Sequence, residues 1–195
     1  MLEQRESEKL RQELEANKRS REMLLEHVTY AIGSKIDFSN TGNAALFMRK
    51  GWSQSEAWGT WTEGCEAVLR IRFAEAPRSD LRMNACLRTY VPAGHAGLKV
   101  NVRVNGKHAG AWTVTNRTFA TLCSDIDLAS LHGAECEIAF EIENPISPRQ
   151  AGVSNDPRLL GLGFKSIDLN LLHAGEPELA HSRGGIDDRS PASRN

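Results

Sequence analysis

The sequence predicts an all-β protein, an antiparallel β-sandwich or jelly roll preceded by an N-terminal coiled-coil helix. Several segments alternate apolar and polar residues with a period of two, and turn sequences rich in Gly, Pro and Asn separate them. A parallel α/β fold would need helices between its strands, and no helical pattern lies there. We divide the chain into a helix over 1–29, a sandwich domain over 30–173 and a disordered tail over 174–195.

The first segment, residues 2 to about 28, contains no Gly or Pro and is dominated by strong helix formers. A heptad register places six residues on one seam that is apolar at both ends and polar in the middle. The seam residues are Leu10, Leu14, Asn17, Arg21, Leu24 and Val28. We predict that this helix joins two or three copies of the chain in a short coiled coil. The alternative is a solvated helical linker without self-association.

Six segments between the helix and the tail predict strands: four alternate apolar and polar residues, the fourth in chain order is the return strand of a hairpin, and the last is apolar enough for an internal strand. These segments are residues 67–73, 81–91, 98–104, 109–114, 136–144 and 160–172. Asn105-Gly106 follows the third segment and is the dipeptide best suited to a type I′ hairpin turn. A domain of about 140 residues buries enough apolar surface for an independent core. The tail has almost no large apolar residues, so it cannot offset its ordering entropy.

The polar faces of these strands carry charges of opposite sign. The basic group is Arg70, Arg72, Arg82, Arg88, Lys99 and Arg103, and the acidic group is Glu137, Glu141 and Glu143. If the strands are neighbours, each cross-strand pair of opposite charge contributes roughly a few tenths of a kcal/mol. The alternative is a basic sheet face that receives an acidic sugar or a phosphate.

Residues 51–64, GWSQSEAWGTWTEG, hold three of the four tryptophans, and this density amid Gly, Ser and Thr is not a strand pattern. An indole face stacks on the apolar C–H face of a pyranose, and a nearby carboxylate accepts hydrogen bonds from sugar hydroxyls. We therefore predict Trp52, Glu56, Trp58 and Trp61 as glycan-binding residues. The alternative is that each Trp fills the core at a sandwich corner while Glu56 accepts hydrogen bonds from turn amides.

A long loop over 144–161 precedes the last predicted strand, and its Pro, Ser, Asn and Asp residues stiffen it through turns. Asp156 and Arg158 complete the predicted glycan-binding set, because long ordered loops often carry function. The alternative for these two residues is a charge-assisted ion pair that ties the loop to the following strand.

Motifs of catalytic and metal-binding sites are missing from the sequence. There is no GxSxG, HExxH or GxxxxGK[ST], and the histidines never occur as HxH or HxxxH. Glu56 and Asp156 would serve as acid and base in glycoside hydrolysis only if they met across a cleft. We predict a protein that is not an enzyme and has no cofactor, and the one metal considered is structural calcium on carboxylates such as Glu56 or Asp156.

The net charge of −1 disfavours a nucleic-acid partner. No apolar run reaches the roughly 18 residues of a membrane span, and the charged N-terminus differs from a signal peptide. The four cysteines, at 65, 86, 123 and 136, lack metal-ligand spacing, and we expect buried thiols. These features predict a cytoplasmic protein.

The chain contains the motif GWSxxExWGTWTEG, then VNG followed closely by Trp112, then NPISPxxxGxSxDPRxLGLGF, over about residues 35–172. Together they resemble a β-sandwich module of unknown function that is attached to bacterial glycosyltransferases and related proteins of surface-polysaccharide assembly. The resemblance implies a non-catalytic accessory domain that recognises a glycan or positions a glycosyltransferase, and the N-terminal helix lies outside it. A purely structural oligomerisation or protein-interaction module is the alternative, followed by a glycan-active hydrolase.

Overall fold

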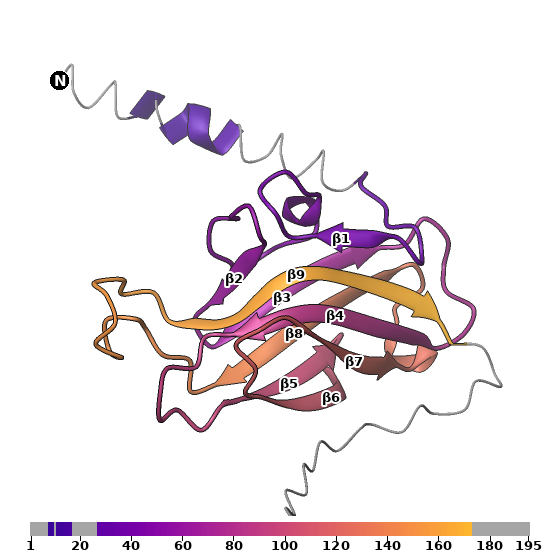
Figure 1. The fold of residues 1–195 in the computed structure, drawn as a ribbon. Coiled ribbons are helices and arrows are strands. Elements are labelled where there is room, and N and C mark those ends of the chain that lie inside the picture. Colours follow the sequence, from indigo (N-terminus) through magenta and orange to yellow (C-terminus); the bar gives the residue numbers. More distant parts are fainter. Residues whose placement is uncertain (1–7, 10, 17–26, 173–195) are drawn as a thin grey trace, which may run out of the picture.

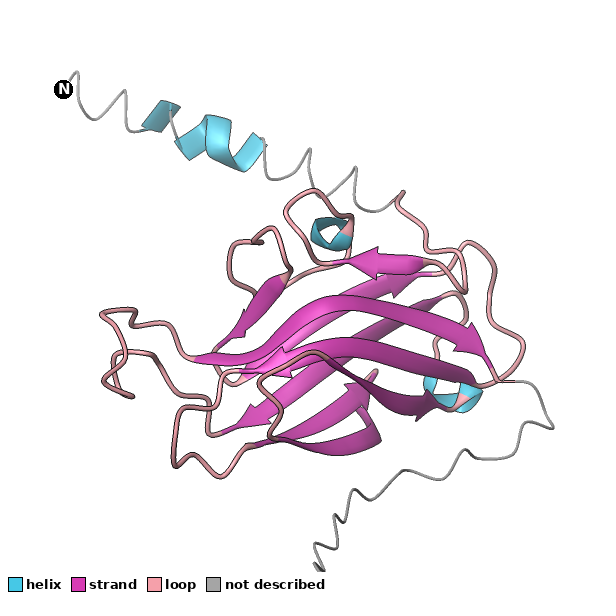
Figure 2. Cartoon of the chain, viewed as in Figure 1, coloured by secondary structure: helices cyan, strands magenta, loops and turns pink. Residues whose placement is uncertain are grey.

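Two antiparallel sheets lie face to face in the computed structural model, which describes residues 8–9, 11–16 and 27–172 (Figure 1). One sheet contains β1 (Lys35–Asp37), β2 (Thr60–Glu63), β4 (Leu81–Thr89), β7 (Ala120–Ile126) and β9 (Leu160–Leu171). The other contains β3 (Glu66–Arg72), β5 (Leu98–Val104), β6 (Lys107–Val114) and β8 (Glu135–Glu143). Strands are the main regular elements of the described chain, with the short 3₁₀ turns η1 (Ala44–Leu46) and η2 (Leu128–Ser130) between them (Figure 2).

The first sheet has the order β1-β9-β4-β7, and β2 also pairs with β9. The second sheet has the order β3-β8-β5-β6. Every strand pair in both sheets is antiparallel. The antiparallel β-sandwich that the sequence predicts is therefore confirmed.

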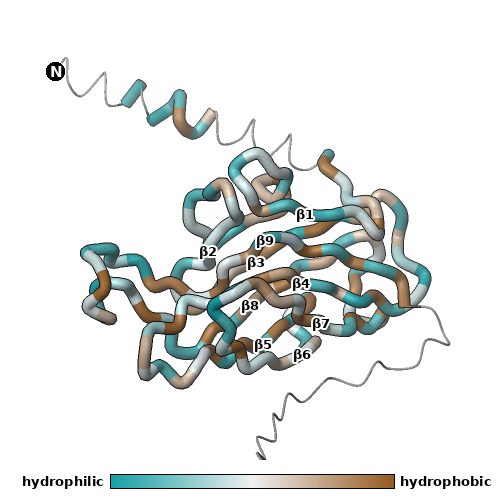
Figure 3. The backbone as a smooth tube through the Cα atoms, in the orientation of Figure 1, coloured by the Kyte–Doolittle hydropathy of each residue, from teal (hydrophilic) through white to brown (hydrophobic). Residues whose placement is uncertain are grey.

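All six predicted strand segments form strands, and their side chains alternate between core and solvent. In β4, buried and half-buried residues alternate from end to end, and the hydropathy of the tube alternates along the strands in the same way (Figure 3). Three strands were not predicted, β1, β2 and β7. The interpretation of residues 51–64 as lacking a strand pattern is wrong at one end, because β2 lies within this segment. The inward residues of β2 are Thr60 and Thr62, so hydropathy does not alternate along it.

The hairpin between β5 and β6 turns at Asn105-Gly106. Both residues have positive φ, 49° and 78°, as a type I′ turn requires. The Asn105 side chain donates a hydrogen bond to the Ser130 carbonyl at 2.8 Å and accepts one from the Glu137 N–H at 2.9 Å. The predicted turn is confirmed, and its Asn also fastens two neighbouring segments.

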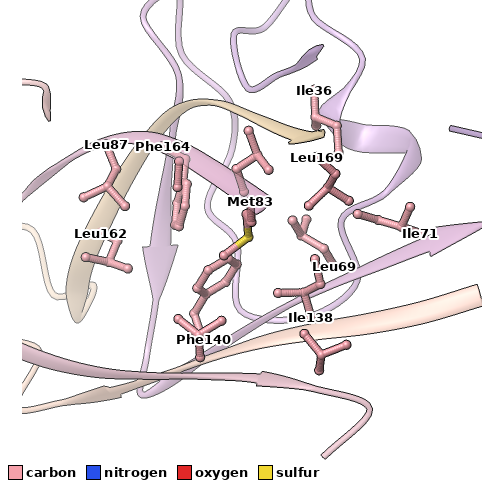
Figure 4. Close-up of a cluster of buried hydrophobic side chains, with 14 of the residues drawn as sticks. Ile36, Leu69, Ile71, Met83, Leu87, Ile138, Phe140, Leu162, Phe164 and Leu169 are labelled. Carbon is pink, nitrogen blue, oxygen red and sulfur yellow. The ribbon is translucent and has the colours of Figure 1, made fainter. Parts of the chain in front are cut away.

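Apolar side chains from both sheets fill the space between them, where Phe140 of β8 and Phe164 of β9 meet with ring centroids 4.9 Å apart (Figure 4). Cys136 belongs to this core, and burial raises the pKa of its thiol to about 12. The expectation of buried thiols is wrong for the exposed Cys65 and Cys123. Cys123 occupies an outward position of β7, and Cys65 lies in the turn between β2 and β3.

Cross-strand ion pairs link the polar faces, because β8 lies between β3 and β5. Glu135 of β8 binds Arg72 at 2.6 Å and Arg70 at 3.0 Å, and Glu141 binds Arg103 at 2.7 Å. On the first sheet, Arg82 of β4 binds Asp125 of β7 at 2.8 Å. These half-exposed pairs each contribute about 0.2–1 kcal/mol, and they confirm the expectation of cross-strand pairing.

Residues 8–9 and 11–16 are helical, as predicted, and Leu14 is 69% exposed. The other predicted seam positions in the helix, Leu10, Asn17, Arg21 and Leu24, lie outside the described residues, as does the tail over 174–195. The helix does not extend to residue 29, because residues 27–29 form a turn and irregular backbone. Val28 is half-buried and packs against the core of the sandwich. Within the described residues, no helix is long and apolar enough to cross a bilayer.

Candidate functional site

The tryptophan-rich segment folds back on itself beside β9. The N–H of Ser53 donates to the carbonyl of Trp61 at 2.9 Å, which pairs the two arms of the loop. At the tip, Glu56 and Gly59 exchange backbone hydrogen bonds of 2.8 and 3.2 Å across Ala57 and Trp58. We call residues 56–59 the Trp58 turn.

The Trp58 turn rests directly on the backbone of β9. Gly59 has a φ of 151°, and a Cβ at this position would lie 2.1 Å from the carbonyl oxygen of Phe164. The hydroxyl of the next residue, Thr60, donates to the Phe38 carbonyl at 2.6 Å. Glycine is therefore required at 59 for this close approach, and the turn holds Trp58 in a fixed place on the sheet.

Trp52 faces the core instead of a ligand. Its ring lies 5.1 Å from that of Phe38 and 5.4 Å from that of Phe164, and its Nε1 donates to the Val68 carbonyl at 2.9 Å. Both its apolar surface and its polar atom are thus engaged within the protein. This position does not support the prediction that Trp52 binds a glycan. Trp52 packs against the core, which was the alternative given for it.

A row of outward-facing residues crosses the first sheet. The strand register places Trp61 of β2 opposite Gly163 of β9, and Gly163 opposite Arg88 of β4. Phe119 immediately precedes β7 at the end of the row. A Cβ at position 163 would lie 2.8 Å from the ring of Trp61 and 2.9 Å from that of Trp58. Gly163 therefore leaves room for both indoles to pack closely against the sheet at this position, with their planes 68° apart.

Arg88 packs against three aromatic rings. Its guanidinium carbon lies 3.9 Å from the ring centroid of Trp58 and 5.1 Å from those of Trp61 and Phe119. Such cation–π contacts contribute about 0.5–1 kcal/mol each at exposed sites and more when desolvated. The Trp58 Nε1 donates to the Glu56 carboxylate at 2.7 Å. The Trp58 ring thus packs against the guanidinium of Arg88, and Glu56 holds that ring in place.

Two buried polar atoms beside this row lack hydrogen-bond partners. They are Nε of Arg88 and the hydroxyl of Tyr90. In the described part of the chain only one other buried side-chain polar atom is in this state, Oγ of Ser124. Buried polar groups are nearly always satisfied by protein, water or ligand. Arg88 and Tyr90 both line the open groove described next, so these two atoms lie at its wall.

An open groove of about 390 Å³ adjoins these atoms, and we call it the Trp61–Arg88 groove. Its lining consists of Trp61, Arg88, Thr89, Tyr90, Val91, Pro92, Ala93, Arg117 and Val153. The rings of Trp61 and Tyr90 meet edge to face with centroids 6.3 Å apart. The volume falls within the roughly 300–1,000 Å³ of small-ligand sites. The loops that follow β4 and precede β9 reach it from the same end of the sandwich (Figure 1).

The loop that carries Val153 is held by an internal ion pair. Arg158 donates to both carboxylate oxygens of Asp156, with the shortest contact 2.6 Å. The guanidinium keeps the pKa of the Asp156 carboxyl below its ordinary value. The N–H of Gly64 donates to the Leu159 carbonyl at 2.8 Å, which ties this loop to the tryptophan segment. Asp156 and Arg158 therefore form the ion pair that was given as the alternative to glycan binding.

The two carboxylates considered for catalysis or calcium both have partners. Glu56 accepts the indole N–H of Trp58, and Asp156 binds Arg158. A glycosidase acid needs a raised pKa, whereas that of Asp156 is lowered. Among the described residues, no group of three or more His, Cys, Asp and Glu could hold a metal ion. Calcium at Glu56 or Asp156 stays a prediction, and the ion would have to displace these partners.

Of the predicted site residues, Trp61 alone lines the groove, while Glu56 and Trp58 support it from the Trp58 turn. The residues that sequence reasoning missed are Tyr90, Arg117, Val153 and Gly163, and Arg88 was named only as one of six residues of a possible basic face. The sequence signal for Arg88 is its outward position in the segment 81–91. Other basic strand residues also occupy outward positions, and this pattern does not show which strand lies beside that of Arg88.

No family model matches the chain, and a search of curated proteins found no match. Solved structures with a similar fold include a xylan-binding module CBM15, 14% identical, with a TM-score of 0.47 over 71% of this chain and 96% of that one. The C-terminal CBM6 of LamC from Zobellia galactanivorans is 10% identical, with a TM-score of 0.44 over 70% and 98%. A CBM36 in complex with calcium and xylotriose is 16% identical, with a TM-score of 0.40 over 70% and 99%. At these scores the likenesses carry no argument about function, which rests below on the chain's own residues.

Proposed function

We propose that this protein is a non-catalytic carbohydrate-binding module and that the Trp61–Arg88 groove is its binding site. One observation supports this most: the aromatic rings of Trp61 and Tyr90 line the same open groove as the guanidinium groups of Arg88 and Arg117. Aromatic faces stack on the C–H faces of sugars, and a few placed polar groups fix the orientation of a ligand. The groove combines both kinds of group.

We expect Trp61→Ala to weaken glycan binding by about tenfold or more, because truncating a central aromatic residue of a binding site costs about 2 kcal/mol. Its free energy of unfolding should fall by only about 1 kcal/mol, since Trp61 is half-exposed. The measurement is a fluorescence and calorimetric titration with acidic and neutral oligosaccharides. Leu171→Ala, at the far end of β9, is the matched control and should bind as the wild type does.

Two results would overturn the proposal. One is a wild-type protein that shows no saturable binding to any oligosaccharide of the panel. The other is a folded Trp61→Ala variant with wild-type affinity. Either result would favour the purely structural or protein-interaction module, for which the groove would have to accept a protein segment.

We propose further that residues 2–28 join copies of the chain, and that the module acts in the cytoplasm with a glycosyltransferase of bacterial surface-polysaccharide biosynthesis. The second part rests only on the sequence motifs described above. The first is supported by Leu14, a seam residue that lies on a helical segment and is 69% exposed. An apolar side chain so placed is available to a second copy.

We expect the protein to have the mass of a dimer or trimer in light scattering after size-exclusion chromatography. Leu14→Asp should shift that mass toward the monomer, because it places a charge on the apolar seam. Trp61→Ala should leave the mass unchanged and serves as the control. A wild-type protein that stays monomeric at all concentrations up to about 0.1 mM would contradict the coiled coil, since its dissociation constant would then lie above about 10⁻⁴ M.

A further inference from the structure

The Trp61–Arg88 groove contains positive charge that the protein does not neutralise. Arg88 and Arg117 both line it, and the side chain of neither forms an ion pair or hydrogen bond with any described residue. Four other strand arginines, at 70, 72, 82 and 103, are all paired with carboxylates. Of the basic strand residues named from the sequence, Arg88 and Lys99 are left without an ion pair to a described residue, and Arg88 is the one that lines the groove.

Arg88 is fixed without being paired. The rings of Trp58, Trp61 and Phe119 surround its guanidinium, and its Nε is buried without an acceptor. The Glu56 carboxylate accepts a hydrogen bond from the Trp58 N–H and forms no ion pair with Arg88. A guanidinium held in this way presents a planar set of donors with little further loss of side-chain entropy on binding.

Arg117 is brought to the groove by a fastened loop. The carbonyl of Asn116 accepts hydrogen bonds of 2.9 Å from both the N–H and the hydroxyl of Thr89 in β4. The Asn116 side chain donates to the carbonyls of Leu87 and Thr118 at 3.4 and 2.7 Å. These bonds hold the segment before β7 against β4, so that a second exposed cation lies at the rim of the groove.

We propose that the glycan bound here is acidic, with a sugar carboxylate accepting hydrogen bonds from Arg88. In this arrangement the sugar's C–H face lies on Trp61, and Arg117 adds attraction from the rim. The inference rests on the proposed function and names its ligand class. A carboxylate matches the planar fork of a guanidinium with two parallel hydrogen bonds, whereas a neutral sugar would leave both cations uncompensated.

The experiment compares acidic oligosaccharides with their uncharged methyl esters. Tetragalacturonate and tetraglucuronate are titrated by calorimetry against their methyl esters, which have the same length and stereochemistry. We expect the acids to bind about tenfold more tightly than the esters at low salt, and the difference to shrink as salt screens the charges. Arg117→Gln should weaken acid binding about fivefold, and Arg88→Lys, which keeps the charge but loses the fork, should remove most of the preference.

The matched control is Arg103→Gln, which removes a basic strand residue from the other sheet and should leave both affinities unchanged. Equal affinity for acids and esters, lost in Trp61→Ala, would overturn the acidic ligand and keep the glycan site. Acid preference that survives both arginine substitutions in folded variants would also overturn it. If neither acids nor esters bind, both the inference and the proposed function fail.

Discussion

Trp52→Ala is expected to lower the free energy of unfolding by about 3–5 kcal/mol, the largest effect that we predict for this chain. The ring of Trp52 touches those of Phe38, Phe140 and Phe164, which join the two sheets. Its removal leaves a cavity at this junction. It also leaves the Val68 carbonyl without the indole donor that binds it at 2.9 Å.

Chemical denaturation followed by circular dichroism measures this loss. Trp52→Phe is the matched control, because it keeps an aromatic ring and removes only the donor and part of the volume; we expect it to cost about 1–3 kcal/mol. Trp61→Ala should cost far less than Trp52→Ala. Equal losses of stability for Trp52→Ala and Trp61→Ala would refute the division between a core tryptophan and a groove tryptophan.

The second large effect is expected at Gly59, where Ala should cost about 3 kcal/mol of stability and abolish glycan binding. The added Cβ would meet the carbonyl oxygen of Phe164 at 2.1 Å. Backbone atoms cannot rotate away as a side chain can, so the Trp58 turn must lift from β9. Trp58 would then no longer support the guanidinium of Arg88, which lies 3.9 Å from its ring centroid.

Gly64→Ala separates this clash from backbone strain alone. Gly64 also has a positive φ, 88°, but a Cβ there meets no atom within 4 Å. It should cost about 1–2 kcal/mol and leave glycan binding intact. Thermal unfolding and the oligosaccharide titration are run on both variants. If the two substitutions behave alike, the contact with β9 does not position the turn.

The strands that the sequence predicts are those whose inward residues are apolar, as in β4 and β5. β2 escapes this test because Thr60 and Thr62 occupy its buried positions. Their hydroxyls are satisfied inside the protein: Thr60 donates to the Phe38 carbonyl, and Thr62 accepts from the Leu162 N–H at 2.9 Å. Hydropathy periodicity cannot reveal a strand whose buried side chains are polar and satisfied by distant segments.

The candidate site is only partly predictable for a different reason. The density of tryptophan in 51–64 points to Trp61 without reference to any other segment. Arg88 becomes part of the site only because β9 lies between β2 and β4 and has glycine at position 163. This alignment joins three distant segments through strand register. Sequence pattern gives which face a strand residue occupies, but not its neighbours in the sheet.

The outer edge of β9 is covered in two pieces, by β1 near one end and by β2 near the other. Each piece is only three or four residues long and carries charged side chains, Lys35, Asp37 and Glu63. A long, flat, exposed edge is a template on which another chain can add a strand and begin a fibril. The broken edge offers no such template here, so concentrated solutions of this protein should resist cross-β aggregation from this side of the sandwich.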